Sequence, residues 1–219
     1  MDPQLLNLII SGTWETIYMT IVSTLIAYVL GVPLGVLLYA TCKGGIFENR
    51  ILNLIFGVIV NVLRSIPFLI LLVAILPFTR LVVGTTLGTS ATIVPLVVAA
   101  APYVARMVES SLKEVDSGVI EAARAMGTSK IEMVTKVFLP EARPSLLIGA
   151  AISLATILGY SAMAGFVGGG GLGAIAINYG YYRYQTDIML ITVLLLVVIV
   201  QIFQEGGLYL ARKTDKRLK

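Results

Sequence analysis

Long apolar runs separated by short polar segments make up most of the chain. Five runs of roughly 20 residues have the length that a helix needs to cross a bilayer, and they cover residues 17–40, 53–77, 89–108, 145–164 and 187–210. A shorter apolar stretch, residues 4–12, precedes them, and we expect it to lie on the outer membrane surface with Trp14 at the interface. The pattern predicts an all-α membrane protein with five transmembrane helices in one domain, residues 1–219.

The longest polar segment lies between the third and fourth runs, and its first half predicts a short helix. Asp116 and Ser117 can cap the start of a helix that continues to Met126, because their side-chain oxygens accept bonds from the first free N–H groups. Gly127 suits the left-handed conformation in which many helices end. The segment therefore has both a start and a stop signal.

A second helix is expected to follow at once. Ser129 and Glu132 have the spacing of a capping box, Glu132 precedes Lys136 by four residues, and Pro140 is expected to stop the helix. Residues 106–143 hold six basic and six acidic side chains, so the segment is neutral and does not suit a nucleic-acid backbone. A protein partner fits it better.

The composition agrees with a membrane protein and removes several kinds of site. Of the 219 residues, 58% are apolar and 13% are charged, and the mean hydropathy is +0.94, far outside the range of soluble domains. Cys42 is the only cysteine and there is no histidine. The sequence therefore offers neither a disulfide framework nor a cluster of His and Cys ligands for a metal.

Lysine and arginine are distributed unequally between the two sides that five spans create. One side holds thirteen of them, in residues 41–52, 106–143 and 212–219, and the other holds only Arg80 and Arg183. Positive residues accumulate in cytoplasmic loops. We therefore expect the N-terminus outside, the polar segment and the C-terminus in the cytoplasm, and the basic tail on anionic lipid.

Arg64 lies near the middle of the second run, where an unpaired guanidinium is costly in lipid. It either lines a water-filled cavity on a translocation route or ties helices together by bonding carbonyl groups, and the residues leave both readings open. Pro67 is expected to free the carbonyl of Leu63, one turn earlier in the same helix.

Two glycine-containing segments indicate close packing. In the first run, the Gly-x-Pro-x-Gly sequence at residues 31–35 implies a kink or a tight helix contact, and we favour the contact. After the fourth run, glycines occupy positions 168–171. A nucleotide-binding loop would need the pattern G-x-x-x-x-G-K-[ST], which the chain lacks, so these glycines are expected to let the backbone approach a neighbouring helix.

The polar segment also carries a longer signature. Glu121-Ala122-Ala123, Gly127 after three residues, and Val137-Phe138-Leu139-Pro140 after nine more resemble the EAA signature of ABC importer permeases, with valine where the signature has isoleucine. In that family this region, here about 109–143, contains the coupling helix that sits in a cleft of a cytoplasmic ATPase. The resemblance implies ATPase docking by four residues and attachment to the next span by two: Glu121, Ala122, Ala123 and Gly127, then Leu139 and Pro140.

Residues 60–67 and 159–184 resemble the methionine-importer branch of these permeases, and the resemblance extends over essentially the whole chain. It implies the type I importer permease fold, a bacterial inner-membrane location, and a pathway for D- and L-methionine between two permease copies. The implied partners are two ATPase subunits, which bind ATP and magnesium, and an extracytoplasmic methionine-binding protein; the permease itself binds no cofactor. Six residues are placed at the pathway or its gate: Arg64, Ser65, Pro67, Tyr160, Ser161 and Met163.

Other functions explain the sequence less well. Uphill transport needs energy, and the sequence shows neither a P-loop nor a ladder of intramembrane carboxylates for protons, so a separate subunit must supply it. Another amino acid or small solute is the alternative substrate. A passive homo-oligomeric channel would explain Arg64 but not the doubly capped polar segment. A membrane hydrolase would need serine with lysine, and no lysine lies in a span, so the chain is expected not to be an enzyme.

Overall fold

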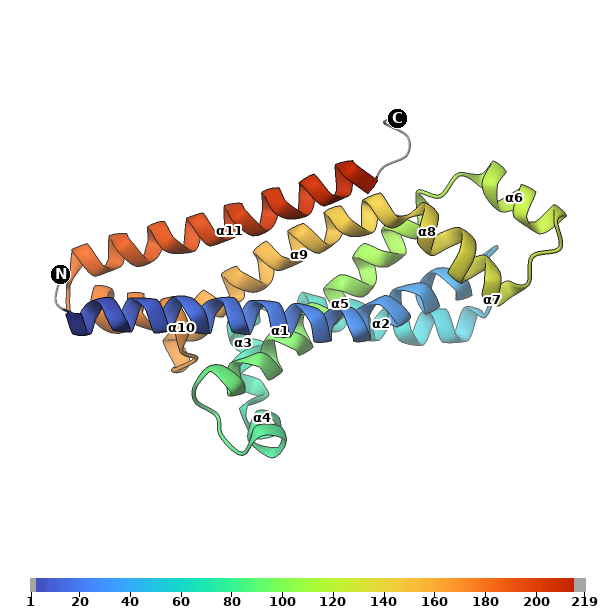
Figure 1. The fold of residues 1–219 in the computed structure, drawn as a ribbon. Helices are drawn as coiled ribbons and strands as arrows, with labels where there is room; N and C mark the ends of the chain where they lie inside the picture. The colour runs from blue at the N-terminus through green and yellow to red at the C-terminus, as the bar shows by residue number, and fades with distance from the viewer. Residues whose placement is uncertain (1–2, 215–219) are drawn as a thin grey trace.

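The computed structural model describes residues 3–214, and this part of the chain is a bundle of helices (Figure 1). Four helices are long and apolar enough to cross a membrane: α1 (Pro3–Thr41), α5 (Thr89–Lys113), α9 (Arg143–Ala164) and α11 (Thr186–Thr214). A bent helix pair makes a fifth candidate span. The all-helical prediction is confirmed for the described residues, and the basic positions 215–219 lie outside them.

The prediction of a separate lead-in at residues 4–12 is wrong, because α1 is continuous from Pro3 to Thr41. Gly12 does not end the helix: it is buried, and a Cβ atom there would lie 2.3 Å from the side chain of Ile175. Trp14 is 69% exposed on the surface of the same helix. The absence of a side chain at Gly12 therefore lets this part of α1 pack closely against Ile175.

Close packing at residues 31–35 is confirmed. A Cβ atom at Gly31 would lie 2.7 Å from Val104, and one at Gly35 would lie 2.5 Å from the carbonyl oxygen of Ala105. The missing side chains let α1 and α5 approach closely along their lengths. This pair forms the centre of the bundle, and Ala105 is fully buried beside it.

The second predicted span, residues 53–77, is not one helix. It breaks into α2 (Arg50–Ser65) and α3 (Phe68–Ala74), which meet at 102°, and α4 (Leu76–Val83) follows. Pro67 restricts the residue before it to extended backbone, and Ile66 has φ −81° and ψ 124°. The prediction of one continuous span is therefore wrong, because the helix ends at Ser65, two residues before the proline.

The glycines at 168–171 pack tightly, as expected. A 3₁₀ turn, η2 (Gly165–Val167), leads into α10 (Gly171–Ile175) and a π-helix, η3 (Ala176–Tyr181). Backbone N–H groups at the start of α10 donate to α1: Gly171 to the Glu15 carboxylate at 2.7 Å and Leu172 to the Thr16 hydroxyl at 2.8 Å. The segment thus folds back against the bundle.

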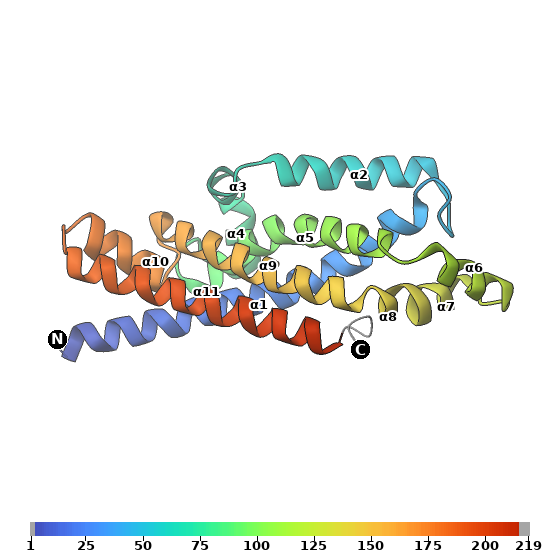
Figure 2. The ribbon, with the colours of Figure 1, turned by 90° about the horizontal axis from the view of Figure 1, so that it is seen from above.

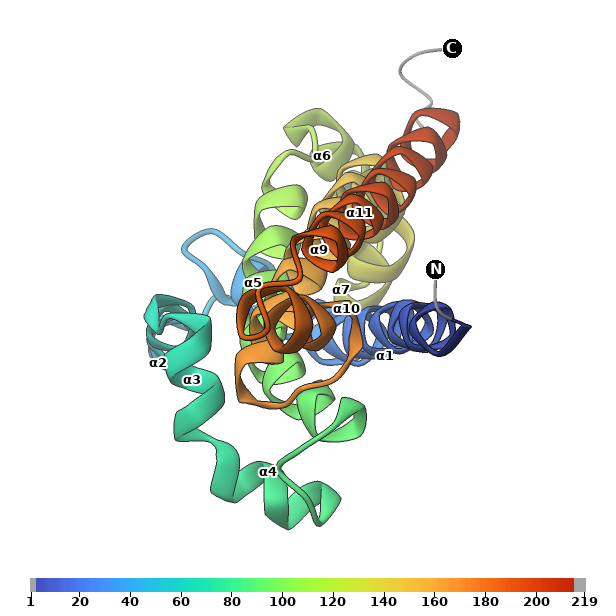
Figure 3. The same ribbon diagram turned by 90° about the vertical axis from the view of Figure 1, so that its left-hand side faces the viewer.

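The two ends of the bundle carry different elements. The start of α1 and α10 lie at one end, whereas α6 (Ser117–Ala125) and α7 (Lys130–Glu132) lie at the other, towards which α11 runs (Figure 1). Seen from above, α2 runs along the edge of the bundle beside α5 (Figure 2). Viewed from one end, α3 and α4 project to the side (Figure 3).

Candidate functional site

The polar helix pair, residues 116–140, begins where α5 ends. Asp116 caps α6 by accepting hydrogen bonds from the backbone of Gly118 at 2.8 Å and Val119 at 3.3 Å. The helix ends at Met126, and Gly127 follows with φ +76°. Both signals predicted for this helix are confirmed.

The start of the second helix is also confirmed. The Ser129 hydroxyl and the Glu132 carboxylate form the reciprocal bonds of a capping box around α7. Lys136 lies 2.7 Å from the other oxygen of Glu132. The hydrogen bond from Lys136, with those from Ser129, lowers the pKa of Glu132 to about 2, so this carboxylate stays charged at acidic pH values at which a free glutamate is protonated.

The expectation that Pro140 stops the second helix is wrong. The chain continues through a π-helix, η1 (Met133–Phe138), and α8 (Leu139–Glu141) into α9. The N–H of Leu139 bonds to the carbonyl of Val134, five residues back. This wider turn makes room for a ring that would clash with an α-helical turn, and Pro140 lies at the start of α8, where no N–H is needed.

Apolar contacts join the polar helix pair to the bundle. Ala123, Met133 and Phe138 are each at most 3% exposed and share one cluster with the end of α5. The ring of Phe138 meets Tyr39 of α1 edge-on at 5.1 Å between centroids. The Lys130 ammonium lies 5.1 Å from the centre of the Phe47 ring. The pair therefore has a buried face that fixes its orientation.

The opposite face of the pair is exposed. Glu121, Ala122 and Gly127 lie on the surface, whereas Ala123 packs inward, so the predicted docking residues divide between two faces. Two apolar side chains were missed by the sequence analysis: Met126 is 79% exposed and Ile131 is 72% exposed. Their signal was apolar character on either side of Gly127 in a polar segment. Apolar groups so exposed at the end of the bundle indicate a partner surface.

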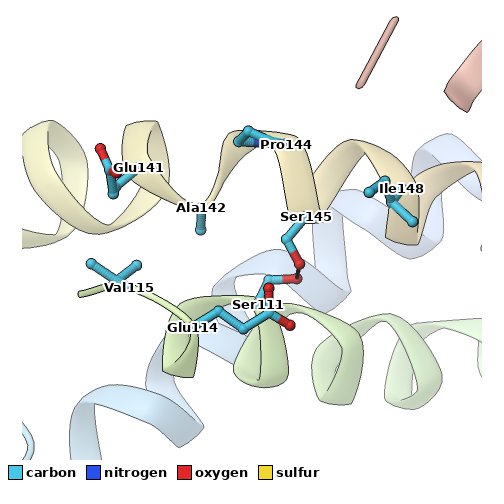
Figure 4. Close-up of a pocket in the computed structure, with 8 residues that line it drawn as sticks. All are labelled: Ser111, Glu114, Val115, Glu141, Ala142, Pro144, Ser145 and Ile148. Atoms are coloured by element: carbon cyan, nitrogen blue, oxygen red, sulfur yellow. Dashed lines mark hydrogen bonds between the residues drawn. The ribbon is translucent and has the colours of Figure 1, made fainter. Parts of the chain in front are cut away.

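A cavity of about 330 Å³ lies at the base of the pair (Figure 4). Ser111 and Glu114 at the end of α5 face Glu141 and Ser145 across it. The Ser145 hydroxyl donates to that of Ser111 at 3.0 Å and bridges the two helices. No sequence pattern indicates this cavity, because its lining comes from two segments some thirty residues apart in the chain.

Part of the second group of predicted site residues lies at the break between α2 and α3. The ring of Phe68, which follows Pro67, stacks on Tyr160 of α9 at 4.6 Å between centroids and an interplanar angle of 6°. Arg64 is exposed, and the Ser65 hydroxyl donates to the Asn61 carbonyl at 2.8 Å. The break and α9 are thus in direct contact.

The other two residues of that group differ in exposure. Met163 is 44% exposed, whereas Ser161 is 1% exposed and its hydroxyl donates to the Leu158 carbonyl at 2.8 Å. In this conformation Ser161 faces the interior of its own bundle. Across residues 3–214, no three His, Cys, Asp or Glu side chains are grouped closely enough to hold a metal ion.

The chain belongs to the family described as the binding-protein-dependent transport system inner membrane component, whose model matches residues 31–215. It is therefore a multi-pass component of the inner membrane.

Within the family the chain is similar to the probable D-methionine transport system permease protein MetI of Vibrio cholerae, with 50% identity over 211 residues, 96% of this chain and 94% of that protein. The protein of the same description from Pasteurella multocida is 49% identical and covers 99% of this chain and 100% of its own.

Solved structures agree. An inward-facing MetNI methionine ABC transporter has a chain that matches with a TM-score of 0.97 at 49% identity, covering 99% of this chain and 100% of its own. An amino acid ABC transporter solved with histidines matches with a TM-score of 0.80 at 20% identity and shows the shared fold.

Proposed function

We propose that this chain is the permease subunit through which D- and L-methionine enter the cell, energised by a separate ATPase. The observation that carries the proposal is the polar helix pair, which is capped at both helix starts and fixed on one face by a buried apolar cluster. On its other face, Met126 and Ile131 are exposed. The methionine-transport descriptions of full-length relatives at about half identity support the substrate.

The exposed face of the pair is the surface we assign to ATPase docking. Glu121, Ala122 and Gly127 lie on it, and Met126 and Ile131 add apolar area that a cleft in the partner would bury. Ala123 fixes α6 to the bundle instead. Leu139 and Pro140, in α8, join the pair to α9, and ATP and magnesium belong to the ATPase.

A second copy of the chain is the partner we propose for α2. Of the residues in α2, all of which the structure describes, only Val60 is buried. A translocation pathway between two copies would place Arg64, Ser65, Pro67 and Met163 near its lining, with Tyr160 holding the break and Ser161 behind it. ATPase closure would then draw two helix pairs together and rock the bundles between inward- and outward-facing states.

The proposed orientation puts the N-terminus outside and the polar helix pair in the cytoplasm. Basic residues, Lys43 and Arg50 among them, gather on the side that we assign to the cytoplasm, and the polar helix pair lies at the end opposite the start of α1. Both observations support this orientation. An extracytoplasmic methionine-binding protein would deliver substrate at the end where α10 lies.

Charge reversal at Glu121 tests the docking surface. The tagged permease is purified from native membrane in mild detergent, with Glu48→Lys as a matched charge reversal in a neighbouring exposed loop. We expect an ATPase to co-purify with the unchanged chain and with Glu48→Lys but to be lost with Glu121→Lys. Absence of an ATPase from every sample would favour the passive channel.

Substrate identity is tested separately with the complex in proteoliposomes. We expect ATP-dependent accumulation of labelled D- and L-methionine when the binding protein is present. Accumulation of another amino acid in place of methionine would leave the importer standing and replace its substrate.

A further inference from the structure

Helix α2 is held to the bundle by a small apolar cluster around Val60 and by polar contacts on one face. The Asn53 amide donates to the Leu38 carbonyl at 2.7 Å and to the Thr41 hydroxyl at 3.1 Å, both on α1. Four and eight residues further on, Gly57 and Asn61 lie on the same face and contact α5 instead. The helix therefore has one polar attachment to α1 and another to α5.

The polar attachment of α2 to α5 is a single side chain, the guanidinium of Arg106. One nitrogen of Arg106 donates to the Gly57 carbonyl at 3.2 Å and to the Asn61 side-chain oxygen at 2.8 Å. A Cβ atom at Gly57 would lie 3.7 Å from this nitrogen, an ordinary van der Waals distance, so the guanidinium lies directly against the backbone of α2. The planar fork of arginine suits such simultaneous bonds, whereas a lysine ammonium acts as a point charge.

The same guanidinium is tied to the end of α5 nearest the polar helix pair. Its other terminal nitrogen pairs with Glu109, whose side chain is 8% exposed. Glu109 also pairs with Lys113 at 2.7 Å, and Lys113 is the last residue of α5. The Glu109 carboxylate is held from both sides, because it accepts a charge-assisted hydrogen bond from each of these two cationic side chains. A polar chain of contacts thus runs from Lys113 through Glu109 and Arg106 to α2.

We propose that Arg106 is a positioning residue that makes α2 move with α5 when the polar helix pair is displaced, and so carries that displacement to the break at Pro67. The inference rests on the proposed function, since it needs an ATPase that moves the pair. When α5 tilts, the bonds from Arg106 to Gly57 and Asn61 carry the middle of α2 with it. The far end of α2 then changes its angle to α3, which Phe68 holds against Tyr160.

A purely structural role for Arg106 would have a different result. Losing a structural anchor lowers the amount of folded complex, and hydrolysis and uptake then fall in proportion. Losing a transmission contact leaves the complex assembled and separates the two activities. The ratio of ATP hydrolysed to solute accumulated therefore distinguishes the roles.

The experiment measures this ratio for the purified complex with its ATPase in proteoliposomes, using the solute that the unchanged complex accumulates. Asn61→Leu removes the side-chain acceptor for Arg106, and Arg106→Lys replaces the planar guanidinium by an ammonium group. We expect the ratio to rise on the order of tenfold in both, since a hydrogen bond to a charged group contributes a factor of about that size or more. Asn61→Asp keeps an acceptor and should retain the original ratio.

Asn53→Leu is the matched control, because it removes the attachment of α2 to α1 with the same substitution on the same face. We expect it to leave the ratio unchanged. An assembled Asn61→Leu complex with the original ratio would overturn the role of Arg106 while leaving the importer intact. If the complex without substitutions shows neither ATP hydrolysis nor uptake, the proposed function fails, and this inference fails with it.

Discussion

Single residues decide how closely the helices of this bundle approach. At Gly35 the nearest neighbour of an added Cβ atom would be the backbone oxygen of Ala105, which cannot rotate away. At Gly206 in α11, nothing lies within 4 Å of the same position. Two glycines that look alike in the sequence therefore have opposite tolerances.

Replacing these two glycines by alanine should change stability in opposite directions. Gly35→Ala overfills the contact between α1 and α5 and should cost about 1–3 kcal/mol. Gly206→Ala relieves the low helix propensity of glycine and should be neutral or stabilising by up to about 1 kcal/mol. Thermal unfolding in detergent, followed by size-exclusion chromatography, measures both; equal midpoints for the two variants would contradict the packing described here.

Local signals were the ones that the sequence revealed at this scale. Asp116, Ser129 and Gly127 were identified correctly, because a cap is formed by residues within a few positions of each other. The contact of Arg106 with Asn61 joins positions 45 apart in the chain. No periodic pattern in the sequence indicates a pair so far apart, so the attachment of α2 to α5 could be recognised only in the structure.

At the scale of elements, hydropathy predicted an apolar segment long enough for a second span but not the bend within it. Residues 53–77 are mostly apolar, and an average over them is the same for a straight helix as for one bent by 102°. Pro67 was recognised as a perturbation. Its effect was underestimated because the restriction on Ile66 acts together with the stacking of Phe68 on Tyr160.

Pro67→Ala should weaken the break and reduce uptake without releasing the ATPase. Removing proline favours a continuous helix by about 3 kcal/mol, which exceeds the roughly 1 kcal/mol of an aromatic stack such as Phe68 with Tyr160. Pro33→Ala, an exposed proline inside the unbroken α1, is the control and should leave uptake unchanged. Uptake assays and co-purification together check this; normal uptake by Pro67→Ala would show that the break does not depend on the proline.

At the scale of the whole molecule, charge distribution predicts which end faces the cytoplasm. The loop that contains Cys42 and Lys43 lies between α1 and α2, at the end where the polar helix pair is found. The family and its shared fold were predicted correctly from one signature, because the EAA segment is contiguous in sequence. The pathway residues stay a prediction: Arg64 and Met163 are exposed on the single chain, where a second copy would be needed to enclose them.

The one cysteine allows the orientation to be measured directly. A membrane-impermeant maleimide should leave Cys42 unlabelled in intact spheroplasts and label it in inverted vesicles, because its loop should face the cytoplasm. In a Cys42→Ser background, Lys43→Cys should behave in the same way and Thr86→Cys, in the loop after α4, in the opposite way. Labelling of Cys42 from outside would reverse the orientation proposed here.

The π-helix between the polar helix pair and α9 gives the spacing of the family signature a further meaning. Each residue of an α-helix turns the chain by about 100°, and a π-turn accommodates one residue more than an α-turn. If residues 133–138 formed α-helical turns throughout, the same number of residues would place the surface bearing Met126 and Ile131 about 100° further round relative to α9. The nine residues between Gly127 and Val137 therefore determine the rotation of the exposed surface relative to α9 as well as its distance from α9.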